Sequence, residues 1–200
     1  MTAKHYQIWL FRHGSTAWSR SRQHTGRTDL ALDEIGRQRA ARIGERLNRR
    51  PFKLVLSSPL SRALETCRLA GYGDDVELTN DLLEWDYGDY EGLRTDDIRK
   101  ERPGWLLWND DVPNGETADQ VAERVDRVIA RATAAGGDVA LFGHGHCLRV
   151  LTARWLSLPP RDGQMFLLDT ATVSVLGFEH DYHVIRKWNQ AADLVEVKET

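Results

Sequence analysis

Cysteine is scarce in this sequence, because only Cys67 and Cys147 occur among its 200 residues. Two isolated thiols build no disulfide framework, and their separation lacks the spacing of metal ligands. They fit a protein that stays in a reducing compartment. Residues 1–6 are polar and show no secretory signal, so we expect a cytoplasmic protein.

Long apolar runs and an excess of positive charge are also missing. No stretch of about 18 apolar residues is present, so no membrane association is expected. The formal net charge of −3 disfavours a general nucleic-acid binder. We find no internal repeat, low-complexity segment or linker. With 41% hydrophobic residues, the chain is expected to fold as one domain, residues 1–200, with a substantial core.

The first ordered element predicted is a strand over residues 6–12, whose nearly continuous apolar character indicates burial on both faces. It runs directly into Arg12, His13 and Gly14. Ligands bind at the carboxyl edge of open α/β sheets. An arginine beside a histidine can hold an anion, and histidine can act as a nucleophile. On their own, these residues could equally be ordinary polar residues at a strand end.

The same order of strand, polar turn and helix occurs twice more. After a strand at 54–56, Ser58 suits a helix cap and Pro59 suits the first helical position, which places Arg62 in the first turn. The positive end of a helix favours a bound anion. After a strand at 139–142, His144 stands between two glycines. A helix over 147–156 follows it.

Periodicity and capping residues predict the other elements. Asp33 is an N-cap candidate, and Thr117 with Gln120 forms a capping box. The remaining predicted helices span 34–50, 94–102 and 118–135, and the remaining predicted strands span 76–79, 165–168, 173–178 and 184–188. This order predicts an α/β fold, a three-layer α/β/α sandwich. The last strands follow one another without helices, so we expect a mostly parallel but mixed sheet.

Two irregular stretches are long enough to be functional. The stretch 15–32 is rich in Ser, Thr, Arg and His, and the stretch 85–92 alternates aromatics, acids and glycines.

Five blocks of sequence carry a family pattern. They are Leu10 to Gly14, Thr25-Gly26, Ser57 to Ala63, Glu84 to Gly92, and Gly143 to Gly145. In this order they resemble the histidine phosphatase superfamily (branch 1), which is phosphoglycerate-mutase-like, over nearly the whole chain. Details within the last two blocks look like the subgroup with actinobacterial acid phosphatases and yeast sedoheptulose-1,7-bisphosphatase. True phosphoglycerate mutases carry an insertion after the acidic loop that is missing here, which favours a phosphatase.

This resemblance implies a metal-independent phosphatase without a cofactor. It would hydrolyse a phosphomonoester, a sugar phosphate or bisphosphate, through a phosphohistidine on His13. Arg12, Arg62 and His144 would hold the phosphoryl oxygens. Glu84 would give a proton to the leaving alcohol and take one from water. The acids that compete for that role are Asp86, Glu91 and Glu116.

The resemblance also suggests which residues select the substrate, a small phosphorylated metabolite. They are Ser19, Thr25, Gly26, Tyr87, Arg149 and His180. Arg22, His24 and Arg27 could hold a second phosphate, or they could form an ordinary solvated basic loop. His146 is interpreted as a supporting residue. A homodimer is possible, since the sequence does not decide the oligomeric state.

Other functions stay open at this point. A phosphoglycerate-type mutase would return the phosphoryl group from His13 to a substrate instead of to water. A non-catalytic module that binds a phosphorylated ligand would use the same fold, although all the expected catalytic residues are present. A metallohydrolase is disfavoured, because no His, Asp or Cys cluster has ligand spacing.

Overall fold

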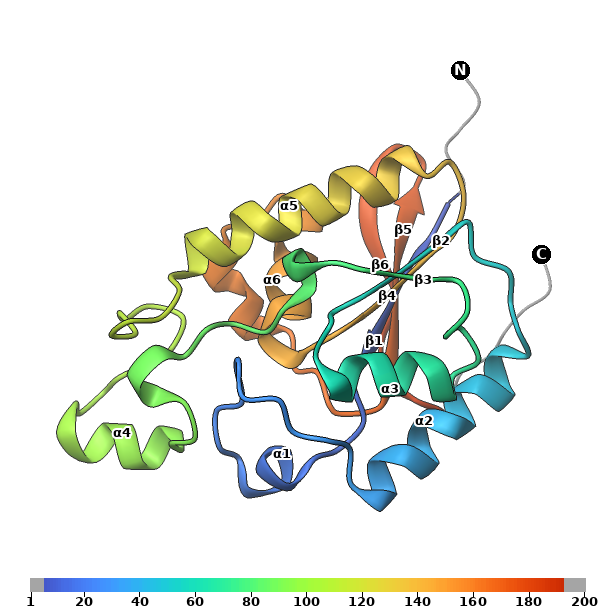
Figure 1. Cartoon of the computed structure of the whole chain (residues 1–200). Helices are drawn as coiled ribbons and strands as arrows, with labels where there is room; N and C mark the ends of the chain where they lie inside the picture. The colour runs from blue at the N-terminus through green and yellow to red at the C-terminus, as the bar shows by residue number, and fades with distance from the viewer. Residues whose placement is uncertain (1–5, 193–200) are drawn as a thin grey trace.

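A computed structural model describes residues 6–192, so most of the polar stretch 1–6 lies outside the described residues. Its strands are β1 (Ile8–Arg12), β2 (Leu54–Ser57), β3 (Val76–Leu78), β4 (Val139–Gly143), β5 (Thr172–Glu179) and β6 (Tyr182–Ala191). They form one sheet in the order β3-β2-β4-β1-β5-β6 (Figure 1). Strands β1 to β4 run parallel to one another. Strand β5 runs antiparallel to both of its neighbours, β1 and β6. The predicted mixed α/β sheet is therefore confirmed.

Helices cover both faces of this sheet (Figure 1). The α-helices are α1 (Ala17–Ser21), α2 (Glu34–Leu47), α3 (Ser61–Leu69), α4 (Thr95–Glu101), α5 (Ala118–Ala134) and α6 (Gly145–Trp155). Short 3-10 helices span Asn80–Leu82, Gly88–Tyr90 and Pro160–Met165. Alternate side chains of β1 point into two separate cores. Trp9 and Phe11 pack with α2 and α3, whereas Ile8 and Leu10 pack with α5 and α6.

The register of the parallel strands sets the position of the polar turns. Arg12 pairs with Gly143, and Ser57 pairs with Phe142, so β1, β2 and β4 end at the same edge. The residues that follow these strands, including His13 and His144, therefore meet there, as expected for a parallel sheet.

Two predicted helix starts are confirmed by their caps. Asp33 Oδ1 accepts a hydrogen bond from the Gly36 amide at 2.8 Å. Thr117 and Gln120 form the reciprocal capping box. Each cap satisfies backbone donors that have no partner inside the helix.

The start predicted for α3, at Pro59, is wrong by two residues. The helix begins at Ser61, because Leu60 is still extended with φ −64° and ψ 136°. Ser58 does not cap it in the usual way. The Ser58 hydroxyl instead accepts a hydrogen bond from His144 Nε2 at 2.8 Å.

The strand predicted over 165–168 is also wrong. Met165 ends a 3-10 helix, and the residues after it are irregular. Strand β6 pairs with β5 alone, while the Trp188 indole donates to the Leu167 carbonyl. The apolar run therefore borders the sheet without joining it.

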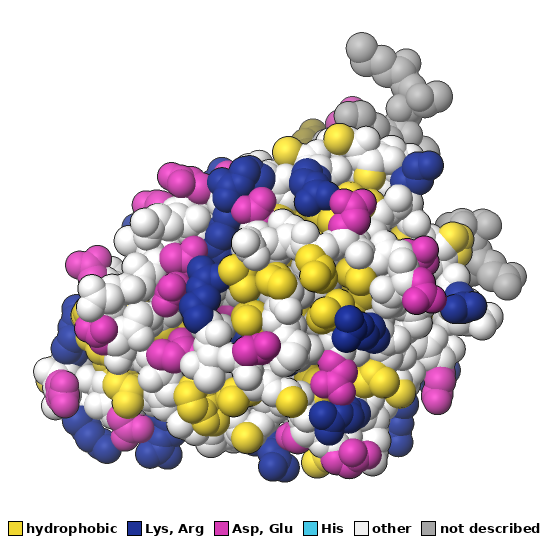
Figure 2. All heavy atoms as spheres, in the orientation of Figure 1, with side chains coloured by type: hydrophobic (Ala, Val, Ile, Leu, Met, Phe, Trp, Pro, Cys, Tyr) yellow, Lys and Arg dark blue, Asp and Glu magenta, His cyan; other side chains and the backbone are white. Residues whose placement is uncertain are grey.

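No helix within residues 6–192 is long and apolar enough to cross a membrane. On the face shown in Figure 2, basic and acidic side chains are interspersed.

Candidate active site

His13 lies just beyond β1, with only 4% of its surface exposed. Its Nδ1 atom is 2.7 Å from the Gly14 carbonyl oxygen, which can only accept, so Nδ1 carries the proton. Burial, followed by the charges of Arg62 and Arg12, holds the pKa of His13 well below its ordinary value. The ring is therefore neutral at physiological pH, and its Nε2 lone pair is free to act as a nucleophile.

Arg12 ends β1, and its guanidinium lies in the same cavity as His13. One terminal nitrogen donates to the Leu168 carbonyl. Its Nε is buried and has no partner among residues 6–192. A Cβ added to Gly145 would lie 3.2 Å from Cζ of Arg12, so the glycine lets the guanidinium approach the start of α6. Arg12 is placed to bind an oxyanion.

Arg62 and His144 are not among the residues that line this cavity, and both have 0% exposure. The centre of the His144 ring lies 5.1 Å from that of His13. Arg62 Nε donates to His144 Nδ1 at 3.1 Å. His144 must therefore carry its proton on Nε2, which donates to Ser58. Burial first, and then the charge of Arg62, keeps the pKa of His144 well below its ordinary value. Both ring nitrogens are thus used within the protein.

The terminal nitrogens of Arg62 hold the long loop. They donate to the carbonyl oxygens of Thr28 at 2.9 Å, Thr25 at 3.1 Å and Gly26 at 2.8 Å. The expected closeness of Arg62 to the site is found, but its donors are directed at the loop backbone.

Glu84 follows the 3-10 helix Asn80–Leu82, and its carboxylate lines the cavity. Its Oε1 accepts from the amides of Trp85 and Cys147, both at 2.9 Å. Its Oε2 accepts from the His146 amide at 3.1 Å, at the amino end of α6. These contacts fix the carboxylate on the positive end of the helix. Oε2 makes one hydrogen bond fewer than Oε1, so it is the oxygen better able to exchange a proton.

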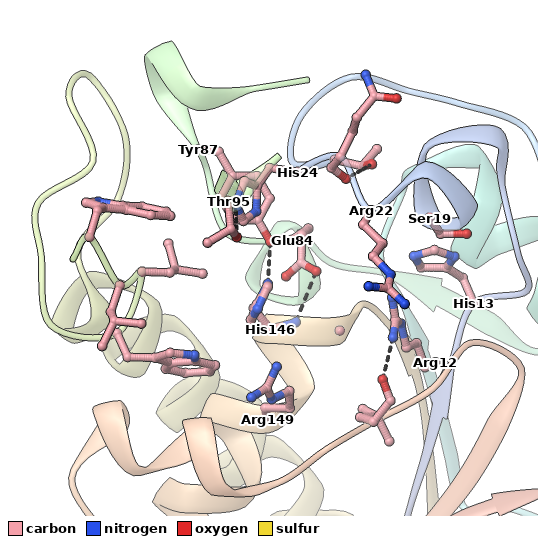
Figure 3. Close-up of a pocket in the computed structure, with 18 residues that line it drawn as sticks. Arg12, His13, Ser19, Arg22, His24, Glu84, Tyr87, Thr95, His146 and Arg149 are labelled. Carbon is pink, nitrogen blue, oxygen red and sulfur yellow. Dashed lines mark hydrogen bonds between the residues drawn. The ribbon is translucent and has the colours of Figure 1, made fainter. Parts of the chain in front are cut away.

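The cavity itself has a volume of about 360 Å³. Arg12, His13, Arg22 and Ser19 line one side, as Figure 3 shows, and Glu84 lies at its centre. The opposite wall is mainly aromatic and apolar. It is formed by His24, Tyr87, Trp105, Leu106, Leu107 and Trp108.

A chain of contacts links Tyr87 to two histidines on this wall. Tyr87 Oη lies 2.5 Å from His146 Nδ1, and its ring is 4.7 Å from that of His24. Burial raises the pKa of Tyr87 well above its ordinary value, so the phenol stays protonated. Burial also lowers the pKa of His24 to about 4 and that of His146 well below the ordinary value. The wall is therefore uncharged near neutral pH.

Some residues predicted to select the substrate do line the cavity. Ser19, Thr25, Tyr87 and Arg149 are among them. The Ser19 hydroxyl already accepts from the Thr16 amide in the capping box of α1, and it donates to the Thr16 carbonyl. Arg149 donates to the carbonyls of Gly163 and Gln164 and lies 4.6 Å above the Trp108 ring.

Gly26 has a different position from the one expected. It is buried behind the cavity, and its amide donates to Glu91 Oε1 at 2.8 Å. A Cβ there would lie 2.5 Å from the Trp85 carbonyl oxygen. Gly26 therefore allows two loops to approach closely.

His180 is not brought to the site. It lies in the turn between β5 and β6, with φ 51°. Because β5 runs antiparallel to β1, that turn is at the opposite end of the sheet from His13. The expectation that His180 contacts the substrate is therefore wrong.

The basic loop residues divide into two groups. Arg22 and His24 line the cavity. Arg27 instead lies 3.4 Å from both Asp86 Oδ2 and Glu116 Oε2. Glu91 and Glu116 also bind protein groups, which agrees with their interpretation as loop and helix-start acids.

Two features were missed from the sequence. Trp105 and Trp108 line the cavity but were not predicted as site residues. Arg124 of α5 is 6% exposed and donates to Glu116 and to the carbonyls of Leu83 and Glu84. The helical periodicity could have predicted this burial, because Arg124 occupies the same face of α5 as the core valines.

No group of three or more His, Cys, Asp or Glu side chains within the described part of the chain is arranged to hold a metal ion. Arg12, His13 and Glu84 together can bind an oxyanion, attack it and exchange a proton.

Comparisons with known proteins agree with this chemistry. An acid phosphatase of Mycobacterium tuberculosis is 40% identical over 184 residues, covering 90% of each chain. A sedoheptulose 1,7-bisphosphatase of Saccharomyces cerevisiae is 37% identical over 182 residues, which covers 74% of this chain and 67% of the yeast protein.

Solved structures share the fold. The product of a Mycobacterium tuberculosis open reading frame superposes with a TM-score of 0.89 at 38% identity, covering 94% of this chain and 98% of that one. A mycobacterial glucosyl-3-phosphoglycerate phosphatase bound to VO3 gives 0.81 at 28% identity, covering 92% and 98%. The family model of the histidine phosphatase superfamily (branch 1) matches residues 8–191. The chain belongs to the histidine phosphatase superfamily, branch 1.

Proposed function

We propose that this protein hydrolyses phosphomonoesters of sugars through a phosphohistidine formed on His13. The observation that carries the proposal is the protonation of His13. Its Nδ1 proton is committed to the Gly14 carbonyl, so Nε2 faces the cavity with a free lone pair. Nucleophilic catalysis divides one difficult displacement into two easier ones.

In the first step, His13 Nε2 forms a bond to phosphorus while the phosphorus–oxygen ester bond breaks. Glu84 Oε2 gives a proton to the departing alcohol oxygen. Arg12 binds the phosphoryl oxygens, whose charge its planar donors match. Arg62 stabilises the same charge from below the cavity and keeps the loop in place.

In the second step, water attacks phosphorus and the bond to Nε2 breaks. Glu84 takes the proton of that water, inorganic phosphate leaves, and the starting state returns. Leu106 and Trp108 offer apolar surface for the carbon skeleton of a sugar, while Arg149 offers a polar edge. The sugar phosphates named for the yeast and mycobacterial relatives support this substrate class.

The test is trapping of the intermediate. Quenching in alkaline SDS during turnover of ³²P-labelled phenyl phosphate is expected to leave an alkali-stable, acid-labile label on the wild type and none on His13→Ala. We expect His13→Ala to lose about 10⁴-fold or more in kcat. His180→Ala is the matched control, and it should keep both the label and the activity. Substantial turnover by clean His13→Ala would overturn the assignment.

A mutase is the second candidate, because a probable phosphoglycerate mutase of Salmonella arizonae is 27% identical over 192 residues. The fate of the labelled phosphoryl group separates the two functions. A phosphatase releases inorganic phosphate, whereas a mutase returns the label to added 3-phosphoglycerate.

A further inference from the structure

Arg124 of α5 is a buried arginine outside the lining of the cavity, with 6% of its surface exposed. Its Nε and Nη2 donate to the two carboxylate oxygens of Glu116, at 2.9 and 3.0 Å. Such a two-point pair fixes the orientation of both side chains as well as balancing their charges. A buried ion pair is weak evidence for added stability, so the other groups that Arg124 holds are informative.

The remaining donors of Arg124 hold the backbone that carries Glu84. Nη1 donates to the carbonyl oxygens of Asp81 at 3.0 Å and Leu83 at 2.6 Å. Nη2 donates to the carbonyl oxygen of Glu84 itself at 3.2 Å. Residues 83–87 belong to no helix or strand, so their backbone groups depend on partners elsewhere in the fold. Arg124 supplies such partners from a long helix.

Glu116 holds the same segment on the other side of Glu84. Its Oε2 accepts from the Asp86 amide at 2.9 Å, and its own amide donates to the Asp86 carbonyl at 2.9 Å. Its carbonyl accepts from the Trp85 indole at 2.8 Å. The ion pair of Arg124 and Glu116 therefore fixes the chain both before and after Glu84.

The carboxylate of Glu84 is held by another helix, α6, which Arg124 also reaches. Glu84 Oε1 accepts from the Cys147 amide at 2.9 Å, and Arg124 Nη1 lies 3.5 Å from Cys147 Sγ. Burial raises the pKa of Cys147 to about 11, so this thiol is neutral at physiological pH and does not replace Glu116 as the counter-charge. Arg124 thus connects the backbone of Glu84 with the end of α6 that binds its carboxylate.

We propose that Arg124, through its pair with Glu116, is the positioning residue of the proton donor Glu84. By fixing the backbone over residues 83–86, it keeps the Glu84 carboxylate where the departing alcohol oxygen receives its proton. Arg124 does not line the cavity, so it acts only through Glu84. A misplacement of about 1 Å in a reacting group can cost about 10²-fold in rate. This inference rests on the proposed function, because it requires Glu84 as the proton donor.

The experiment compares two esters that differ in their need for a proton. Phenoxide is a poor leaving group and departs as phenol, whereas 2,4-dinitrophenolate is stable enough to depart as the anion. Loss of a proton donor should therefore affect phenyl phosphate far more than 2,4-dinitrophenyl phosphate. The quantity measured is kcat/KM, which reports on the steps up to release of the alcohol and excludes the later attack of water.

Glu84→Gln is the reference variant, and its kcat/KM should fall by about 10²-fold or more for phenyl phosphate and by less than about tenfold for the dinitrophenyl ester. Arg124→Lys keeps the positive charge beside Glu116 but loses the planar pair of donors. It should lose about tenfold to hundredfold with phenyl phosphate and about threefold or less with the dinitrophenyl ester. Adding Arg124→Lys to Glu84→Gln should cause no further loss, because residues that act as a unit are not additive.

Arg50→Lys is the matched control. Arg50 also forms a shielded ion pair, with Nη2 2.7 Å from Asp138 Oδ2. Asp138 directly precedes β4, so this pair lies at the opposite end of the sheet from His13. Arg50→Lys should lower the melting temperature without changing kcat/KM for either ester. If Arg124→Lys does not fold, Glu116→Gln weakens the same pair from its other side and should show the same selective loss.

Two outcomes would overturn the proposal while Glu84→Gln shows its selective loss. One is wild-type activity, or an equal loss with both esters, in Arg124→Lys. The other is a double variant whose losses multiply. Failure of the proposed function gives a different pattern, in which Glu84→Gln itself treats both esters alike. The role of Arg124 would then be rejected together with that of Glu84.

Discussion

Replacing Arg62 with methionine should separate its structural role from that of Arg12. In Arg62→Met, three loop carbonyls and His144 Nδ1 lose a buried donor. An unsatisfied buried polar group costs about 1–3 kcal/mol, and relief of the buried charge offsets part of the sum. We therefore expect a loss of about 3–5 kcal/mol in the free energy of unfolding. In Arg12→Met the Leu168 carbonyl is the one acceptor within residues 6–192 that loses a donor, which costs about 1–2 kcal/mol.

Urea unfolding followed by tryptophan fluorescence measures these differences, and the chain has seven tryptophans. Limited trypsin digestion gives a local readout, because cleavage after Arg27 reports whether the loop held by Arg62 has loosened. Arg62→Met should be cut there faster than Arg12→Met. Arg127→Met removes an exposed arginine paired with Asp81 and should unfold at nearly the wild-type urea concentration.

Equal destabilisation by Arg62→Met and Arg12→Met would refute this reasoning. So would wild-type protection of the Arg27 site in Arg62→Met. Either result would mean that the carbonyl contacts of Arg62 contribute little, and that its donors are available to the substrate.

Two further predictions concern the loop and the cavity wall. His24 has a pKa of about 4 in the folded state and about 6.5 in the unfolded state. Between pH 6.5 and pH 4 the unfolded state therefore binds more protons, so the free energy of unfolding falls as the pH drops through this range. His24→Phe should remove up to about 3 kcal/mol of this fall, measured by urea titrations at pH 7 and pH 4, and an unchanged pH dependence would contradict the assignment. Gly26→Ala should cost about 1–3 kcal/mol, because its Cβ would press on the Trp85 carbonyl, and a melting temperature equal to wild type would argue against that contact.

Local features of the sequence predicted local structure well. The apolar run at β1 and the capping box of Thr117 and Gln120 depend on neighbours in the chain, and both are found. The run at 165–168 has the same apolar character but forms no strand. Strand formation requires a partner, and β5 pairs with β1 and β6 instead.

The candidate site was predictable where it depends on strand ends. The residues after β1 and β4 meet because parallel strands share an edge, so His13 and His144 were placed correctly. His180 was misplaced because the direction of β5 relative to β1 cannot be derived from apolar patterning. The hydrogen-bond partners of Arg62 depend on the path of a loop that lies 34 to 37 residues away in the sequence. No local sequence signal encodes that path.

The backbone of His13 is held on both sides, although the residue lies beyond its strand. Its amide donates to the Gly143 carbonyl at 3.0 Å, and its carbonyl accepts from the Ala171 amide at 3.0 Å. Gly143 ends β4, the parallel neighbour of β1. Ala171 directly precedes β5, the antiparallel neighbour of β1. The reversal of strand direction at β1 thus fastens the nucleophile like a residue inside a sheet. In the proposed reaction the phosphorus atom would therefore move from the departing oxygen to a residue whose backbone is held in place.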